Sequence, residues 1–69
     1  MIIFKGANNM KEYCVVDEFG NNIDCFDWTD EGYENAEILA KEYFGRVLEV
    51  TYNKHEQEIA CECVWEWGD

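Results

Sequence analysis

Residues 12–28, "EYCVVDEFGNNIDCFDW", decide the fold, because two β-prone runs flank a turn sequence. The stretch from Asp17 to Asn21 suits a three-residue loop, in which a type I turn is followed by Gly20 in the left-handed conformation. Such a loop places Asp17 opposite Asn21. The sequence therefore predicts a β-hairpin here.

The register of that hairpin assigns its side chains to two faces, since successive residues of a strand point in opposite directions. It pairs Val15 with Ile23 and Tyr13 with Cys25. We therefore expect one face to carry Tyr13, Val15, Ile23 and Cys25, and the other to carry Cys14, Val16, Asp24, Phe26 and Trp28.

Residues 29–45, "TDEGYENAEILAKEYFG", predict a helix. Thr29 or Asp30 is suited to the N-cap, acidic residues crowd the first turn, and Gly45 is suited to the C′ position that ends the helix. A core-facing stripe at helical spacing holds Tyr33, Ala36, Leu39, Ala40 and Tyr43, and another stripe holds Asp30, Glu34, Glu37 and Lys41.

Two further strands follow the helix, residues 46–52 and a run that begins at residue 58, separated by the polar turn "NKHEQ". In the last strand the strict alternation sends Ile59, Cys61, Cys63, Trp65 and Trp67 one way, and Glu58, Ala60, Glu62, Val64 and Glu66 the other. The predicted fold is α+β, in the order ββαββ, with a four-stranded, mostly antiparallel sheet and one helix packed on one face.

Residues 10–69 are expected to form a single acidic domain, and two interpretations of residues 1–9 stay open. Lys5-Gly6-Ala7 can be encoded by a bacterial ribosome-binding sequence, with Asn8-Asn9 as the spacer before a start at Met10. Residues 1–9 would then be a translated leader. Alternatively, "IIF" is a short edge strand.

The charge of −11 limits the classes of partner. Nucleic acids and anionic membranes require clustered Lys and Arg, so direct binding to either is not expected, whereas a partner with a basic groove is compatible. The chain is 48% hydrophobic, which is enough to fold. No segment approaches the about 20 apolar residues of a membrane span, and no secretion signal is evident. We therefore expect a cytoplasmic protein with four free thiols.

The pair Cys61-x-Cys63 invites a metal interpretation, but strand packing explains it better, because buried free cysteine behaves as a small hydrophobe. Zinc on Cys14, Cys25, Cys61 and Cys63 is a minor alternative, since the usual C-x₂₋₄-C spacing is missing and Cys14 is expected on the face opposite Cys25. A disulfide from Cys25 to Cys61 or Cys63 is the other alternative. No metal and no cofactor is predicted.

An enzyme is not predicted either. The single histidine, His55, falls in a predicted turn, and the sequence has no phosphate-binding loop, G-x-S-x-G or H-E-x-x-H motif. A chain of this size leaves little room for the enclosed pocket that catalysis requires.

Acidic residues carry the strongest functional signal. Asp24, Asp27, Asp30, Glu31 and Glu34 fall within eleven residues without a basic residue among them, and Glu37 continues the helical row. Groups three or four apart on a helix lie about 5–6 Å from one another, which approaches the spacing of phosphates along a nucleic-acid strand. A second row, Glu58, Glu62 and Glu66, is expected on the solvent face of the last strand. A purely solubilising surface is the alternative.

Aromatic side chains among these acids favour an interface, since aromatic anchors inside a charged rim are usual there. Phe26, Trp28 and Trp67 are expected on surfaces that the helix leaves open. The predicted partner-binding residues are Asp24, Asp27, Trp28, Asp30, Glu31, Glu34, Glu37, Phe26, Glu62 and Glu66.

In its size, its acidity and its hairpin "VVDEFGNNIDCFDW" leading into a helix, the whole chain resembles, as a class, the small acidic phage-encoded proteins that block bacterial defence or host nucleic-acid enzymes. Anti-CRISPR proteins and DNA-mimic inhibitors belong to this class. The resemblance implies a viral protein in the cytosol of its host, which binds a basic channel stoichiometrically and competes with DNA or RNA. No family motif assigns individual residues.

The leading hypothesis is thus a non-catalytic inhibitor of a nucleic-acid-binding protein, such as a CRISPR effector. The second is a small homodimeric structural or adaptor module, in which a second copy covers Cys14, Val16, Phe26 and Trp28. The third is a metal or redox protein that uses the four cysteines.

Overall fold

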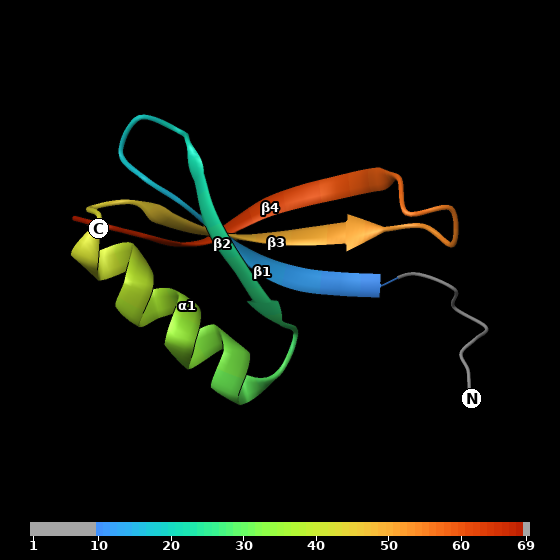
Figure 1. Cartoon of the computed structure of the whole chain (residues 1–69), viewed down its shortest axis with the longest axis horizontal. Helices are drawn as coiled ribbons and strands as arrows, with labels where there is room; N and C mark the ends of the chain where they lie inside the picture. Colours follow the sequence, from blue (N-terminus) through green and yellow to red (C-terminus); the bar gives the residue numbers. More distant parts are fainter. Residues whose placement is uncertain (1–9, 69) are drawn as a thin grey trace.

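Within residues 10–68, four antiparallel strands form one sheet, and a single helix packs on one side of it (Figure 1). The computed structural model describes residues 10–68, so both interpretations of residues 1–9 lie outside it. The sheet has the order β2-β1-β3-β4, and the predicted α+β fold is confirmed. The elements are β1 (Met10–Val16), β2 (Asn22–Asp27), α1 (Asp30–Glu42), β3 (Arg46–Tyr52) and β4 (Glu58–Glu66).

The turn between β1 and β2 has the predicted form. The Asp17 backbone N–H donates to the Asn21 carbonyl over 2.9 Å, and Gly20 has a φ of 88°. The Asp17 carboxylate accepts further hydrogen bonds from the backbone N–H groups of Phe19 and Asn21. The bond from Asn21 is the main reason that the pKa of Asp17 lies below its ordinary value.

A β-bulge at Ile23 then changes the register of the hairpin. Val16 pairs with Asn22 but Val15 pairs with Asp24, which leaves Ile23 as an extra residue. Beyond it the predicted pairing is wrong by one residue, and Cys25 lies opposite Cys14 instead of Tyr13. Cys14 and Cys25 therefore share a face, and Phe26 moves to the face of Tyr13.

The helix begins at Thr29, one of the two predicted N-caps, whose Oγ1 accepts a hydrogen bond from the Gly32 backbone N–H over 2.9 Å. Ala36 and Ala40 allow α1 to approach the sheet closely, and both are fully buried against Val15 and Val47. Tyr13, Ile23, Phe26, Leu39 and Trp65 pack around this core.

Two details of the helix differ from the prediction. Tyr43, expected in the buried stripe, is 47% exposed because the helix ends there as its C-cap. Phe44, not Gly45, adopts the left-handed conformation, with a φ of 54°. Gly45 donates its backbone N–H to the Ala40 carbonyl, and a Cβ at this position would overlap the Val16 carbonyl oxygen. Glycine is needed there for close approach to β1.

Register shifts also divide β4. Trp65 pairs with Val47, whereas Cys63 pairs with Leu48 and Cys61 with Val50. Trp65 reaches the core as predicted, but Cys61 and Cys63 are exposed on the opposite side of the sheet. The prediction that both cysteines are buried under the helix is wrong, because the extra residues in β4 break its strict alternation.

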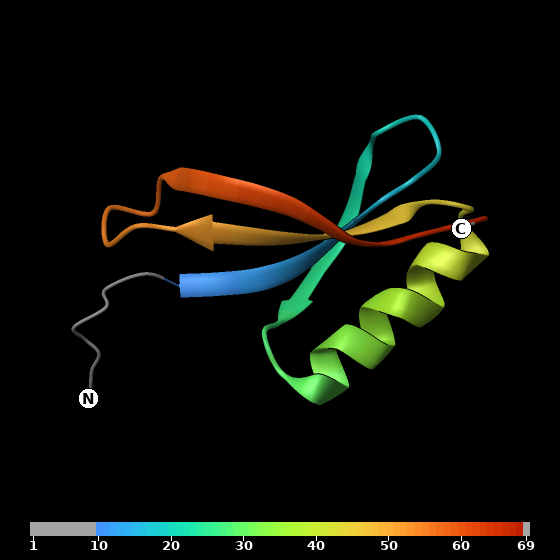
Figure 2. The ribbon, with the colours of Figure 1, turned by 180° about the vertical axis from the view of Figure 1, so that it is seen from behind.

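The sheet thus has a helix-side face and a helix-free face. Figures 1 and 2 show that α1 runs beneath β2 and one half of the sheet, while β1, β3 and β4 continue past the helix toward the β3–β4 loop. Within residues 10–68, no helix combines the length and the apolar character needed to span a bilayer.

Candidate partner-binding surface

The outward side of α1 forms an acidic surface with one apolar residue. Asp30, Glu31 and Glu34 are exposed, and Ile38, one turn beyond Glu34, is 58% exposed. We call these four residues the helix ridge. Their side chains share one side of α1, since residues three and four apart are neighbours on a helix. Glu37 lies at its margin, half-buried and 3.5 Å from the Lys41 ammonium group.

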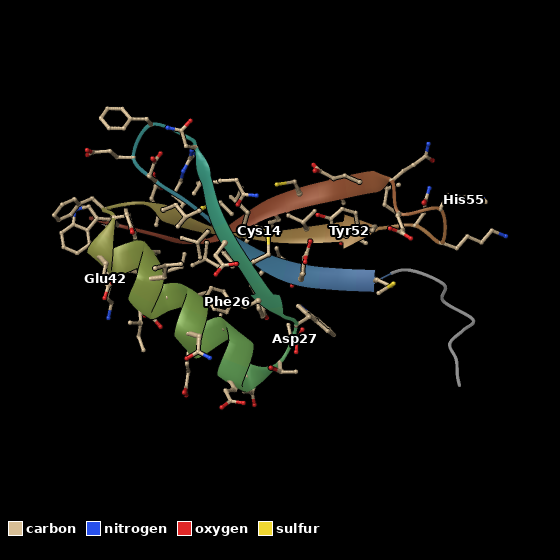
Figure 3. The ribbon with its side chains drawn as sticks, in the orientation of Figure 1. Cys14, Phe26, Asp27, Glu42, Tyr52 and His55 are labelled. Carbon is tan, nitrogen blue, oxygen red and sulfur yellow. A yellow bond between two sulfur atoms is a disulfide. The ribbon has the colours of Figure 1, made fainter. Side chains whose placement is uncertain are left out.

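The two predicted aspartates of β2 separate. Asp24 pairs with Val15 and so belongs to the helix-side face, whereas Asp27 pairs with Glu12 on the helix-free face. Both are exposed. Figure 3 shows Asp27 at the end of β2, where the chain turns toward the first turn of α1. Asp27 therefore precedes the ridge in the chain, but its side chain belongs to the helix-free face of the sheet.

Trp28, the residue before the N-cap of α1, is held by a polar cluster on the helix-side face of the sheet. Its indole Nε1–H donates to the Glu49 carboxylate over 2.9 Å, and the Lys11 ammonium lies 5.5 Å from the centroid of its ring. Lys11 also pairs with Glu49 over 3.4 Å. The hydrogen bond from Trp28, followed by the interaction with Lys11, holds the pKa of Glu49 below its ordinary value.

The prediction that Phe26 and Trp28 occupy the helix-free face is wrong, because the bulge at Ile23 reverses the two sides of β2. Phe26 is half-buried and points between β2 and α1 (Figure 3). Trp28 lies over Lys11 and Glu49 on the helix-side face, yet it stays 50% exposed. Of these two residues, Trp28 is the more exposed to a partner.

Glu62 and Glu66 do not belong to the helix ridge. Glu62 pairs with Glu49 and Glu66 with Arg46, so they fall on opposite faces of β4. Glu58, opposite Tyr52, shares the face of Glu66. The expected single row of Glu58, Glu62 and Glu66 is thus split. β4 is also the edge strand of the sheet opposite to the edge strand β2.

Phe44 and Trp67 form a second exposed surface, of which the sequence predicts only Trp67. The rings of Phe44 and Trp67 meet edge to face, with centroids 5.3 Å apart, and each is about half exposed. The Trp67 backbone N–H donates to the Gly45 carbonyl and fixes the end of the chain here. Trp67 was expected to be open, but Phe44 followed no recognisable pattern, since its exposure results from its left-handed backbone.

The cysteines are not four free thiols. Cys14 and Cys25 form a disulfide across β1 and β2, drawn in yellow in Figure 3, with Cα atoms 4.0 Å apart. Cys61 and Cys63 are free and exposed. The alternative disulfide from Cys25 to Cys61 or Cys63 is not formed, because β2 and β4 are opposite edges of the sheet. For the same reason the four cysteines do not converge on one zinc ion.

A polar pair adjoins the disulfide on the helix-free face. The Tyr52 hydroxyl donates to the Glu12 carboxylate, and this bond is the main reason that the pKa of Tyr52 rises to about 12. The Glu12 carboxylate also lies with the Cys14 and Cys25 sulfurs in a group of atoms within 4.8 Å of one another.

His55 is exposed at the tip of the β3–β4 loop (Figure 3). Asn53 organises this loop, because its side-chain oxygen accepts hydrogen bonds from the backbone N–H groups of His55 and Gln57.

The surface expected for a homodimer is not assembled. Cys14 and Val16 face the helix-free side but are 6% and 7% exposed, while Phe26 and Trp28 lie on the helix side. The register shift at Ile23 thus divides the four residues between two faces.

No protein-family model matches the chain, and neither a curated protein nor a solved structure matches it significantly.

Proposed function

We propose that the protein is a non-catalytic inhibitor that uses the helix ridge to bind the basic nucleic-acid-binding groove of a host or defence protein, such as a CRISPR effector. The observation that supports this most is the composition of the ridge. Three carboxylates line one exposed side of α1, and an apolar side chain sits at their end.

Among residues 10–68, the two lysines nearest to α1 in the chain and the fold have partners outside the ridge. Lys11 is engaged with Glu49 and Trp28, and Lys41 with Glu37. A net charge of −11 adds a long-range field that steers the chain toward a cationic groove. Carboxylates presented along one line would occupy the Lys and Arg side chains that otherwise bind phosphates.

Ile38 on the ridge, and Trp28 before the N-cap of α1, are exposed apolar side chains that a partner can bury. Burial of half-exposed side chains of this kind contributes affinity that salt does not screen, whereas the carboxylates contribute the salt-dependent part. We therefore expect binding to weaken steeply as salt is added but not to vanish entirely.

Capture from bacterial lysate tests the proposal. The full chain is immobilised through a C-terminal tag, bound proteins are eluted by stepwise salt, and each is then challenged with duplex DNA. A nucleic-acid-binding protein that elutes at moderate salt and is displaced by DNA supports inhibition. The proposal is contradicted if no protein is retained, or if the retained proteins are released by neither salt nor DNA. Capture of the chain alone would favour the homodimeric module.

A further inference from the structure

Glu12, Cys14 and Cys25 are three metal-ligating side chains brought together by adjacent strands. Cys14 and Cys25 are directly opposite, and Glu12, two residues before Cys14, points to the same face. One ligand atom from each lies within 4.8 Å of the others. Only the bulge at Ile23 creates this arrangement, because the uninterrupted register would separate the two cysteines.

The spacing fits a tetrahedral thiophilic cation once the sulfurs are reduced. Zinc takes Cys sulfur at about 2.3 Å and carboxylate oxygen at about 2.0–2.2 Å, which places tetrahedral ligand atoms roughly 3.5–3.8 Å apart. Side chains on the same face of neighbouring strands can reach this separation by small rotations about their χ angles. Two thiolates and one carboxylate supply three negative charges, one more than a divalent ion carries, and leave one position for water.

The surroundings hold the carboxylate in place. The Tyr52 hydroxyl, on β3, donates to Glu12. Hydrogen bonds of this kind orient metal ligands and tune their affinity. Cys14 is 6% exposed, whereas Cys25 and Glu12 are half-buried, so the group is sheltered on one side and open to an entering ion on the other.

We propose that the reduced chain binds one zinc-like divalent cation through Cys14, Cys25 and Glu12, and that the disulfide is its metal-free, oxidised form. Two equivalents of a thiol reductant (R–SH) cleave the disulfide, yielding two cysteine thiols and one R–S–S–R. Metal binding then replaces the two thiol protons, which are released to solvent. Oxidation reverses both steps and expels the ion.

The other two cysteines provide a matched control. Cys61 and Cys63 are exposed thiols on the same helix-free face, but Leu48 lies between Cys63 and Cys14 across the sheet. Replacing Cys61 and Cys63 by serine removes as many sulfurs as replacing Cys14 and Cys25. It does so without touching the proposed ligands.

The test uses Co²⁺ as a spectroscopic probe on the full chain, reduced with a phosphine under anaerobic conditions. We expect one Co²⁺ per chain, thiolate-to-cobalt charge-transfer absorption, and displacement by Zn²⁺. The double variant Cys61→Ser/Cys63→Ser should bind like the unchanged chain. The double variant Cys14→Ser/Cys25→Ser should show no charge-transfer band, and oxidised protein should show none.

Two further variants keep the test decisive if loss of the cysteines disturbs folding. Tyr52→Phe should weaken Co²⁺ binding by about tenfold, and Glu12→Gln should weaken it more. Circular dichroism of each variant, compared with the reduced unchanged chain, checks the fold. The proposal is overturned if reduced protein binds no Co²⁺, if the band depends on Cys61 and Cys63, or if Glu12→Gln leaves the affinity unchanged.

Discussion

The two faces of the sheet achieve burial in different ways. On the helix-side face, Val15 and Val47 are fully buried because α1 covers them with Ala36 and Ala40. On the helix-free face, Cys14 and Val50 are nearly as buried, although no helix covers them. Cys14 is joined there to Cys25 by the disulfide, and Val50 lies opposite Glu12 on β1 and Cys61 on β4.

The apolar packing and the chemically reactive side chains therefore lie on different faces of the sheet. The helix-side face uses aliphatic packing for its core and turns the other side of α1, with its acids, toward solvent. The helix-free face collects the thiols, the disulfide and the tyrosine–glutamate pair. We infer that hydrophobic packing on one face and a covalent cross-link on the other each contribute measurably to stability.

A pair of truncations compares the packing of the two faces most directly. Val47→Ala should lower the free energy of unfolding by about 2–3 kcal/mol, since it leaves a cavity under the helix. Leu48→Ala removes more atoms, but its half-buried side chain lies on the helix-free face, so about 1 kcal/mol is expected. Urea denaturation measures both. A larger loss for Leu48→Ala would reverse the assignment of the core.

The Cys14–Cys25 disulfide should contribute nearly as much to the free energy of unfolding as the packing of Val47. The disulfide joins residues eleven positions apart, and loss of such a loop constraint costs about 2–3 kcal/mol. Cys25→Ser should therefore lower the free energy of unfolding by that amount under oxidising, chelated conditions, while Cys63→Ser should change it by less than about 0.5 kcal/mol. Equal effects of the two substitutions would show that the disulfide adds no stability.

The cluster at Trp28 predicts a pH dependence of about 0.5 kcal/mol, a value reduced by solvent screening at this partly exposed site. The pKa of Glu49 is lowered in the folded state from an ordinary value of 4.5. Its contribution is therefore present above that value and is lost as pH falls through the folded pKa. The stability difference between the unchanged chain and Trp28→Phe should be larger at pH 7 than at pH 3. If the difference in stability does not vary with pH, the hydrogen bond from Trp28 does not stabilise ionised Glu49.

The last prediction concerns the hydrogen bond between Tyr52 and Glu12 on the helix-free face. Tyr52 has a pKa of about 12, raised from 10.0 chiefly by its hydrogen bond to Glu12. Glu12→Gln should return it toward 10.0, as followed by tyrosinate absorbance, with Tyr52→Phe identifying the step. The raised pKa stabilises the fold below the unfolded value, and this contribution is lost as pH rises through the folded pKa. An unchanged titration in Glu12→Gln would contradict the hydrogen bond.

The elements could be predicted from the sequence but several faces could not. Turn residues such as Gly20 and the Thr29 cap act locally, so the ends of the strands and the start of α1 follow from residue type. The bulge at Ile23 inserts one residue into β2, and no turn or cap residue marks its position in the sequence. One extra residue moved Phe26 into the core and Cys25 beside Cys14.

The candidate surface was predictable to the same extent. Asp30, Glu31 and Glu34 could be placed together because helical spacing is regular, and their exposure matches the prediction. Glu62 and Glu66 could not, because the alternation of β4 contains shifts that appear only when it pairs with β3. For the acids of β4, long-range pairing with β3 and not residue type decides which face each one occupies.

The salt dependence of binding to a captured nucleic-acid-binding protein tests the central claim most directly. It compares two neutralised triple variants of equal charge. One is Asp30→Asn/Glu31→Gln/Glu34→Gln on the helix ridge. The other is Glu56→Gln/Glu58→Gln/Glu62→Gln on the β3–β4 loop and the edge strand β4. The account predicts that the ridge variant binds roughly tenfold more weakly with a shallower salt slope, while the edge variant keeps the slope and most of the affinity. Equal losses in the two variants would mean that net charge, not the helix ridge, is responsible for binding.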